Sequence, residues 1–107
     1  MRVAILDDIH RAYETTMGVR RLRERAEVTI FDGPFGDPAA LRGFDALVAN
    51  RERTRFTRAL LGELPDLRII AQTGNHAYHI DLAAAAACGI IGLGRVGGHV
   101  AKIANAF

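Results

Sequence analysis

Short apolar runs alternate along the chain with longer segments in which apolar residues recur at helical spacing. The first run, Val3–Leu6, is continuously apolar and ends in two aspartates, a pattern typical of a strand buried on both faces of a parallel sheet. Further strands are predicted at Glu27–Phe31, Asp45–Ala49, Leu67–Ala71 and Ile90–Gly94. The pattern therefore predicts five strands.

Helix signals occupy the segments between these strands. Asp8 is expected to cap a first helix whose inward face carries four apolar residues, Ile9, Tyr13, Met17 and Leu22. Thr57 is expected to cap a later helix, which ends before Pro65 and carries three leucines inward, Leu60, Leu61 and Leu64.

Three further helices complete the pattern, over residues 37–41, 82–87 and 96–107. Asp37 and Asp81 stand at the start of the first two, and Gly89 follows the second as a stop signal. Repeated strand–helix units with short connections force right-handed crossovers and a parallel sheet. The predicted fold is α/β and flavodoxin-like, a five-stranded parallel sheet with helices on both faces.

The chain is expected to fold as one domain over residues 1–107, a length that suits a single hydrophobic core. No internal repeat divides it, and no linker rich in Pro, Gly or Ser interrupts it. Half of the residues are apolar, which excludes the intrinsically disordered class.

Charge and cysteine content narrow the classes of function. The formal net charge is only +2, and the densest basic stretch contains four arginines, Arg51, Arg53, Arg55 and Arg58. They are interleaved with Glu52 and Phe56, which favours a solvated loop and helix face over a nucleic-acid surface. Cys88 is the only cysteine, which excludes an intramolecular disulfide and a cysteine-rich zinc site. No apolar run approaches the ~20 residues of a membrane span, so a cytoplasmic protein is expected.

A glycine motif follows the last predicted strand. Gly92-Leu93-Gly94-Arg95-Val96-Gly97 satisfies G-x-G-x-x-G between an apolar strand and a helix, the context in which this motif binds a dinucleotide. The first glycine permits a tight turn, the second lets a pyrophosphate approach the backbone, and the third lets the helix pack closely. The candidate cofactor-binding residues are Gly92, Gly94, Arg95, Val96 and Gly97.

A complete dinucleotide site also has an acidic residue about twenty positions beyond the glycines. This sequence contains no Asp or Glu after Gly97. Two interpretations therefore stay open: a site for phosphate groups, in which Arg95 also contacts the anion, and a plain strand-to-helix turn.

The segment that contains this motif, Ile90–Phe107, resembles the nucleotide-binding segment of D-isomer-specific 2-hydroxyacid dehydrogenases. The stretch Leu67–Gly74, followed by His79-Ile80-Asp81-Leu82 and Ala-Ala-Cys-Gly-Ile, is similar to the first lobe of that family around its substrate loop. The resemblance covers nearly the whole chain. It implies a flavodoxin-like first lobe, a Rossmann second lobe, NAD(H) as the cofactor of the parent enzyme, and small 2-hydroxy or 2-keto acids as substrates.

The order of the two pieces departs from the family pattern. A segment that usually separates them is missing, so a first-lobe piece over residues 1–90 abuts a Rossmann fingerprint piece over residues 91–107. Residues 91–94 are then expected to replace the first lobe's fifth strand. The family's catalytic Arg, Glu and His lie downstream of the fingerprint, and no position here matches them. The resemblance thus implies a fragment or truncated form of an NAD-dependent oxidoreductase, without hydride transfer in isolation and with NAD(H) binding not expected of the chain alone.

One substrate-binding element of the family is matched. Gly74, Asn75 and His76 follow the fourth predicted strand and correspond to the loop whose backbone amides receive the substrate carboxylate. Many family members have glycine where His76 stands, so a plain surface loop stays open as an alternative. His76 and His79 alone supply too few ligands for a metal, and no metal site is predicted.

Other functions stay open on the sequence alone. A non-catalytic scaffold or self-associating module, for instance a homodimer, is one alternative, because residues 100–107 would present an apolar face to a second chain. Another is that the chain joins segments of a larger protein without the residues between them. A response-regulator receiver is disfavoured, because Asp7 and Asp8 follow the first strand but Asn50 follows the third, where a phosphorylated aspartate is required.

Overall fold

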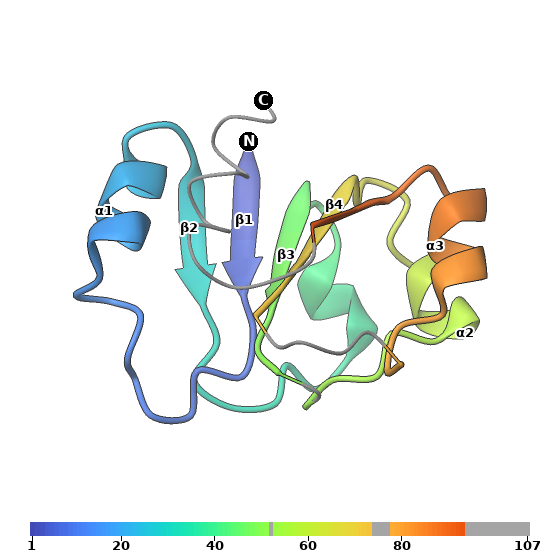
Figure 1. Ribbon diagram of the computed structural model, residues 1–107, viewed down its shortest axis with the longest axis horizontal. Helices are drawn as coiled ribbons and strands as arrows, with labels where there is room; N and C mark the ends of the chain where they lie inside the picture. Colours follow the sequence, from blue (N-terminus) through green and yellow to red (C-terminus); the bar gives the residue numbers. More distant parts are fainter. Residues whose placement is uncertain (52, 74–77, 94–107) are drawn as a thin grey trace.

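The computed structural model describes residues 1–51, 53–73 and 78–93, and a five-stranded parallel sheet lies at its centre (Figure 1). The strands are β1 (Arg2–Ile5), β2 (Glu27–Ile30), β3 (Ala46–Ala49), β4 (Ile69–Gln72) and β5 (Ile91–Leu93). They lie in the order β2-β1-β3-β4-β5, which is the flavodoxin-like order. The predicted α/β class and parallel sheet are confirmed.

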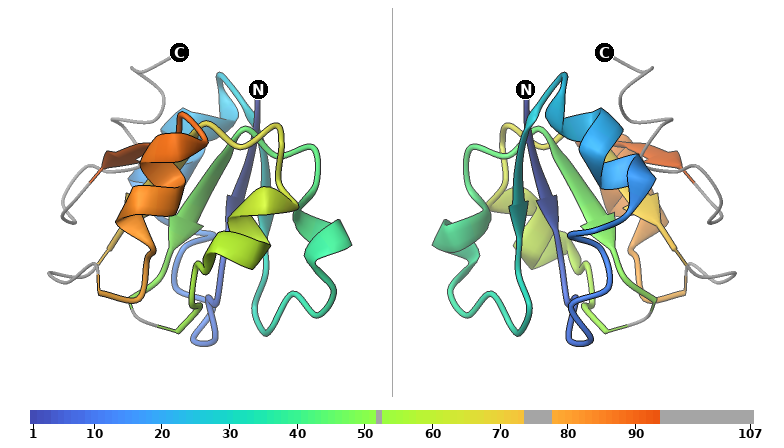
Figure 2. Two further views of the ribbon diagram at one scale, coloured as in Figure 1. Left: turned by 90° about the vertical axis from the view of Figure 1, so that its right-hand side faces the viewer. Right: turned by 90° about the vertical axis from the view of Figure 1, so that its left-hand side faces the viewer.

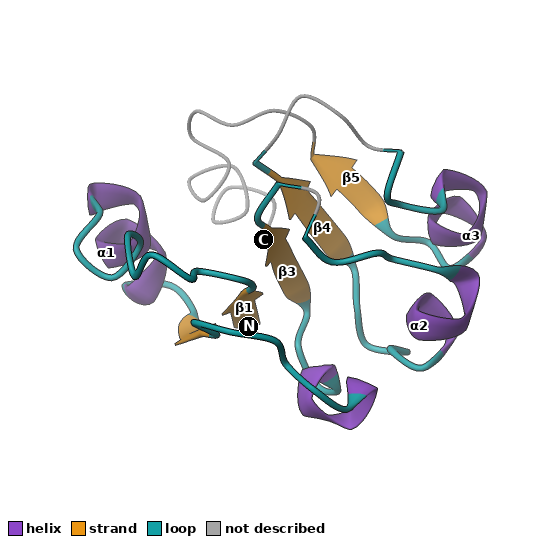
Figure 3. Ribbon diagram, turned by 90° about the horizontal axis from the view of Figure 1, so that it is seen from below, coloured by secondary structure: helices purple, strands orange, loops and turns teal. Residues whose placement is uncertain are grey.

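Helices cover both faces of this sheet. Within the described ranges they are α1 (Met17–Arg23), the 3₁₀ helix η1 (Pro38–Leu41), α2 (Arg58–Gly62) and α3 (Leu82–Ala87). Helix α1 lies over one face, and η1, α2 and α3 lie over the other (Figure 2, Figure 3). The side chains of Asp37, Thr57 and Asp81 each accept a backbone N–H bond in the first turn of a helix, as their sequence positions predicted.

Alternating side chains along the strands fill two cores. Val3 of β1 pairs with Ala46 of β3, which pairs with Ile69 of β4, and this row packs against α1 through Val19 and Leu22. The next row, one residue further along each strand, packs into the opposite core beneath α2 and α3. The central strands are therefore buried on both faces, as the apolar runs predicted.

The fifth strand contains the start of the glycine motif. Ile91 pairs with Ile69 and Gly92 with Ile70, so β5 extends the sheet in parallel with β4. Ile90, just before the strand, is buried in the core beneath α2 and α3. The strand expected from this segment is present over the described residues, whereas the helix predicted over residues 96–107 lies outside them.

The first helix begins later than the sequence pattern suggested, and the prediction that Asp8 caps it is wrong. The Asp8 carboxylate instead accepts hydrogen bonds from the backbone N–H groups of Ala12 (2.9 Å) and Tyr13 (3.2 Å), which closes a turn. Arg11 has a left-handed φ of 52°, which interrupts a helix at that point. Thr16 caps α1 instead, through its hydroxyl.

Substitution of Leu22 tests the packing of α1. Leu22 is 0% exposed, so Leu22→Ala is expected to lower the free energy of unfolding by about 2–5 kcal/mol, because it removes buried methyl groups and leaves a cavity. Leu82→Ala is the matched control, since Leu82 is 60% exposed and its truncation is expected to change that free energy by less than about 0.5 kcal/mol. Urea unfolding followed by circular dichroism measures both. Equal losses would contradict the placement of α1 on the core.

Candidate functional site

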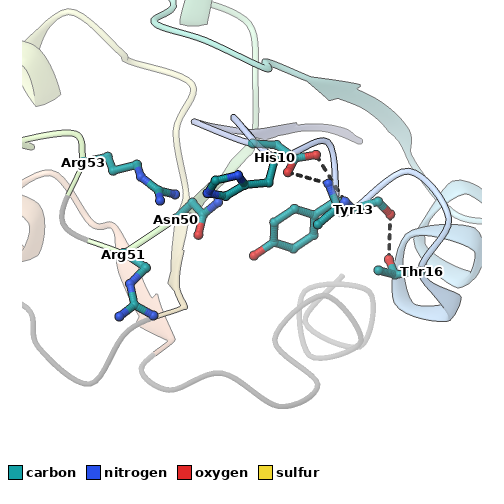
Figure 4. Close-up of a pocket in the computed structure, with 8 residues that line it drawn as sticks. His10, Tyr13, Thr16, Asn50, Arg51 and Arg53 are labelled. Atoms are coloured by element: carbon teal, nitrogen blue, oxygen red, sulfur yellow. Dashed lines mark hydrogen bonds between the residues drawn. The ribbon is translucent and has the colours of Figure 1, made fainter.

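Polar segments meet where the chain leaves β1 and β3, at the edge viewed in Figure 3. These neighbouring strands feed connections that run to opposite faces, and ligands of such sheets bind in the crevice between the connections. A pocket of about 350 Å³ lies there (Figure 4), lined by Asp8, His10, Ala12, Tyr13, Thr16, Asn50, Arg51 and Arg53. Its volume is at the lower end of the range for small-molecule sites.

Three residues on these connections hold the backbone in the left-handed region: Asp7 (φ 56°), Arg11 (φ 52°) and Arg51 (φ 57°). This conformation costs about 1–2 kcal/mol for a residue with a side chain, and it persists only where the surroundings hold it. Among the residues that the structure describes, every non-glycine residue with positive φ lies on the connection after β1 or after β3. Such strain gathered at one edge of the sheet marks a candidate functional site.

Asn50 joins the ends of three neighbouring strands. Its Nδ2 donates to the carbonyl oxygen of Asp7 (3.1 Å), and its Oδ1 accepts from the hydroxyl of Thr73 (3.3 Å). The same hydroxyl accepts from the backbone N–H of Arg51 (2.9 Å). Because Asp7, Asn50 and Thr73 follow β1, β3 and β4, these bonds tie Asn50, which lines the pocket, to the ends of the two neighbouring strands.

The pocket is rich in groups that bind anions. Arg51 and Arg53 lie on one side of it and Tyr13 on the other, with His10 and Asn50 between them (Figure 4). Neither arginine forms an ion pair with any carboxylate of the described residues. The lining carboxylate, Asp8, already accepts two backbone hydrogen bonds. The arrangement therefore suits a small carboxylate or phosphate.

Tyr13 adds a neutral hydrogen-bonding group to this pocket. Burial raises the pKa of its phenol above the usual 10.0, and the nearby Asp8 carboxylate acts in the same direction. A hydrogen bond with Thr73 and the charge of Arg53 partly offset the rise in pKa. The phenol is thus protonated at neutral pH.

Most of the residues predicted from the sequence as site residues lie outside the described ones. These are Gly74, Asn75, His76, Gly94, Arg95, Val96 and Gly97. Thr73, which immediately precedes Gly74, is held by Arg51 and Asn50 at the pocket, so the predicted substrate loop starts from this edge. Gly92 is paired within β5, and its part in cofactor binding stays a prediction.

The sequence interpretation missed His10, Tyr13, Asn50, Arg51 and Arg53. The packing predicted for Tyr13 and the exposure predicted for the two arginines are both present, but the sequence did not show that these residues meet at one pocket. A signal was present, because polar residues follow two buried strands, and the order β2-β1-β3 makes those two strand ends neighbours.

Over residues 1–51, 53–73 and 78–93, no three His, Cys, Asp or Glu residues gather so as to hold a metal ion. No helix in the same ranges is long and apolar enough to cross a membrane.

A family model and several solved structures of dehydrogenases are similar to this chain. Residues 3–105 match the family model of the D-isomer specific 2-hydroxyacid dehydrogenase catalytic domain. An oxidoreductase from Ralstonia solanacearum, named as a D-3-phosphoglycerate dehydrogenase, is 38% identical with a TM-score of 0.80, over 90% of this chain and 30% of its own. A phosphoglycerate oxidoreductase from Vibrio cholerae is 36% identical with a TM-score of 0.80, over 91% of this chain and 32% of its own.

More distant structures share the fold. The NAD-dependent formate dehydrogenase from Staphylococcus aureus, solved in complex with NAD, has a TM-score of 0.71 at 23% identity, over 88% of this chain and 32% of its own. The chain thus spans about 30% of the length of the solved structures that it matches. No curated protein matches it significantly.

The raised pKa of Tyr13 predicts how stability depends on pH. Because the folded chain holds this phenolic proton more tightly than the unfolded chain, stability is unaffected below pH 10.0 and falls as the pH rises through the folded-state pKa. Tyr13→Phe is expected to remove this fall. The difference between the ultraviolet titrations of the wild type and this variant reports the ionisation of Tyr13 alone. A midpoint at or below 10.0 would show that the phenol is not buried as described.

Proposed function

Because the chain belongs to the D-isomer specific 2-hydroxyacid dehydrogenase family, we propose that it binds the carboxylate of a small 2-hydroxy or 2-keto acid between the β1 and β3 connections. The main support is the placement of Arg51 and Arg53 at the switch point of the sheet, without carboxylate partners among the described residues. A guanidinium group holds a carboxylate through two parallel hydrogen bonds. His10, which also lines the pocket, supplies a further donor.

The predicted substrate loop fits the same proposal. Gly74, Asn75 and His76 follow Thr73, whose hydroxyl is bonded to Asn50 and Arg51. Backbone amides of that loop would meet the acid together with the arginines. Two of the similar structures are named for phosphoglycerate, so 3-phosphoglycerate is a first acid to test beside unphosphorylated ones.

Hydride transfer is proposed only for a longer dehydrogenase of the family. The parent cofactor is NAD(H), as in the similar formate dehydrogenase, and Gly92, Gly94, Arg95, Val96 and Gly97 are the residues that would approach its phosphates. The acidic residue that would hold the ribose has no counterpart in these 107 residues, and neither have the catalytic Arg, Glu and His. The chain by itself therefore binds an acid without oxidising it.

We also propose that residues 1–107 form one folding unit in the cytoplasm, with residues 90–91 as the junction between two family segments. The burial of Ile90 and the pairing of β5 with β4 support a single unit. A homodimer remains an alternative from the sequence.

Replacement of the pocket arginines tests acid binding. Arg51→Ala and Arg53→Ala are each expected to weaken binding of D-lactate or 3-phosphoglycerate by roughly ten- to a hundredfold, the loss expected for a hydrogen bond between charged groups. Arg20→Ala is the matched control, since Arg20 is exposed on α1 and does not line the pocket. Calorimetric titration of the 107-residue chain measures the affinities. If the two pocket variants bind as tightly as the control, the acid does not bind in this pocket.

Titration with NADH tests the assignment of cofactor chemistry to a longer protein. After the intact mass has confirmed a chain of 11.6 kDa, addition of NADH is expected to release no saturable heat. A mixture of NAD and D-lactate is expected to give no NADH absorbance. Saturable NADH binding together with turnover would instead make this chain a dehydrogenase.

A further inference from the structure

Two buried polar side chains lie behind the candidate pocket without lining it. Gln72, the last residue of β4, is 4% exposed, and His79 is 6% exposed. Gln72 Nε2 donates to the carbonyl oxygen of Arg51 (2.9 Å), and Gln72 Oε1 lies 2.9 Å from His79 Nε2. Two consecutive hydrogen bonds therefore connect His79 in the core, through Gln72, to Arg51 at the pocket.

The chemistry of the groups fixes which of them donates in each of these two hydrogen bonds. The Arg51 carbonyl only accepts, so the Gln72 amide must turn its NH₂ group toward it. The amide oxygen then faces His79, whose Nε2 must carry a proton in order to donate. Without that proton donor, the buried amide oxygen would lose its partner, and the Gln72 side chain would be held only through its bond to the Arg51 carbonyl. The histidine therefore anchors the oxygen end of the amide, and together with the Arg51 carbonyl it fixes the position of the Gln72 side chain.

The amide in turn holds the backbone of Arg51 in its strained conformation. Arg51 has a φ of 57°, which an arginine rarely adopts. Its N–H donates to the Thr73 hydroxyl (2.9 Å) and its carbonyl accepts from Gln72, so both backbone polar groups are bonded to residues at the end of β4. Loss of the bond from Gln72 would leave a carbonyl without its partner on a residue already in an unfavourable conformation.

His79 is itself firmly anchored. Its backbone carbonyl accepts from the N–H of Phe56 (2.9 Å), and Phe56 forms an isolated parallel bridge with Ile80. The Phe56 ring is 0% exposed, and its centroid lies 6.4 Å from that of the His79 ring. The imidazole is thus buried beside Phe56 on a backbone that is hydrogen-bonded to the same residue, which suits a supporting role.

We propose that His79 is a positioning residue, which acts through the Gln72 amide to keep Arg51 in the conformation that presents its guanidinium to the acid. The readout in acid affinity rests on the proposed function. The effect of His79 on the Arg51 backbone is independent of the proposed function, because it follows from the contacts of His79, Gln72 and Arg51 alone.

Three variants of the full chain test this role. His79→Phe keeps an aromatic ring beside Phe56 but removes the donor, and it is expected to weaken acid binding about tenfold and to speed hydrogen exchange of the Arg51 amide. His79→Gln, which keeps an N–H donor, is expected to restore much of the acid affinity and much of the protection of the Arg51 amide from exchange. His79→Phe combined with Gln72→Met is expected to lose no more than either change alone, because the two residues act in series.

Leu22→Ala is the control for a general loss of stability, since Leu22 lies in the core on the α1 side of the sheet. It is expected to lower stability while leaving acid affinity and the relative protection of the Arg51 amide unchanged. If His79→Phe does not fold, Gln72→Met with His79 in place provides the same comparison. Unchanged Arg51 exchange in a folded variant, or losses that add in the double variant, would overturn the positioning role. If the wild type binds no acid, the proposed function fails while the exchange data still decide the role of His79.

Discussion

Strand β1 is hydrogen-bonded to β3 from Val3–Ala46 to Ile5–Val48, and the rest of the molecule depends on this pairing. It buries the first apolar run on both faces, because each row of side chains continues across the neighbouring strands into one of the two cores. It also sends the two following connections to opposite faces of the sheet. The crevice that opens between them brings Tyr13 to Arg51, although the two are far apart in the chain.

Polar contacts then give that crevice a defined shape. Asn50, Thr73 and Gln72 satisfy the backbone groups of residues that would otherwise relax out of the left-handed region. Each such conformation is unfavourable by about 1–2 kcal/mol, and the hydrogen bonds to Asp7 and Arg51 help to offset this cost. The pocket is therefore organised before any ligand arrives, which reduces the entropy lost when a ligand binds.

The features that could be read from the sequence are those decided locally. Asp37, Thr57 and Asp81 cap their helices because a capping bond spans only a few residues, and the apolar runs form strands because burial on both faces needs no particular partner. Asp8 looked like a further cap, yet its backbone N–H is bonded to the carbonyl of Phe31 beyond β2, and its carboxylate closes a turn instead. Arg51 and Arg53 are exposed, as the sequence predicted, but their meeting with Tyr13 at one pocket depends on strand order. That order is a property of the whole sheet and not of any short segment.

The pairing of β5 with the edge of β4 bears on how such chains evolve. Gly92 lies in β5 between Ile91 and Leu93, in a segment whose sequence also satisfies a nucleotide-binding motif. β4 is hydrogen-bonded to this segment through backbone peptide groups, which are the same in every residue. The pairing therefore requires few particular side chains in the added strand. An edge of this kind is a permissive position for recombination, where a segment from elsewhere in a gene can be grafted onto the sheet while the pairings between the inner strands are kept.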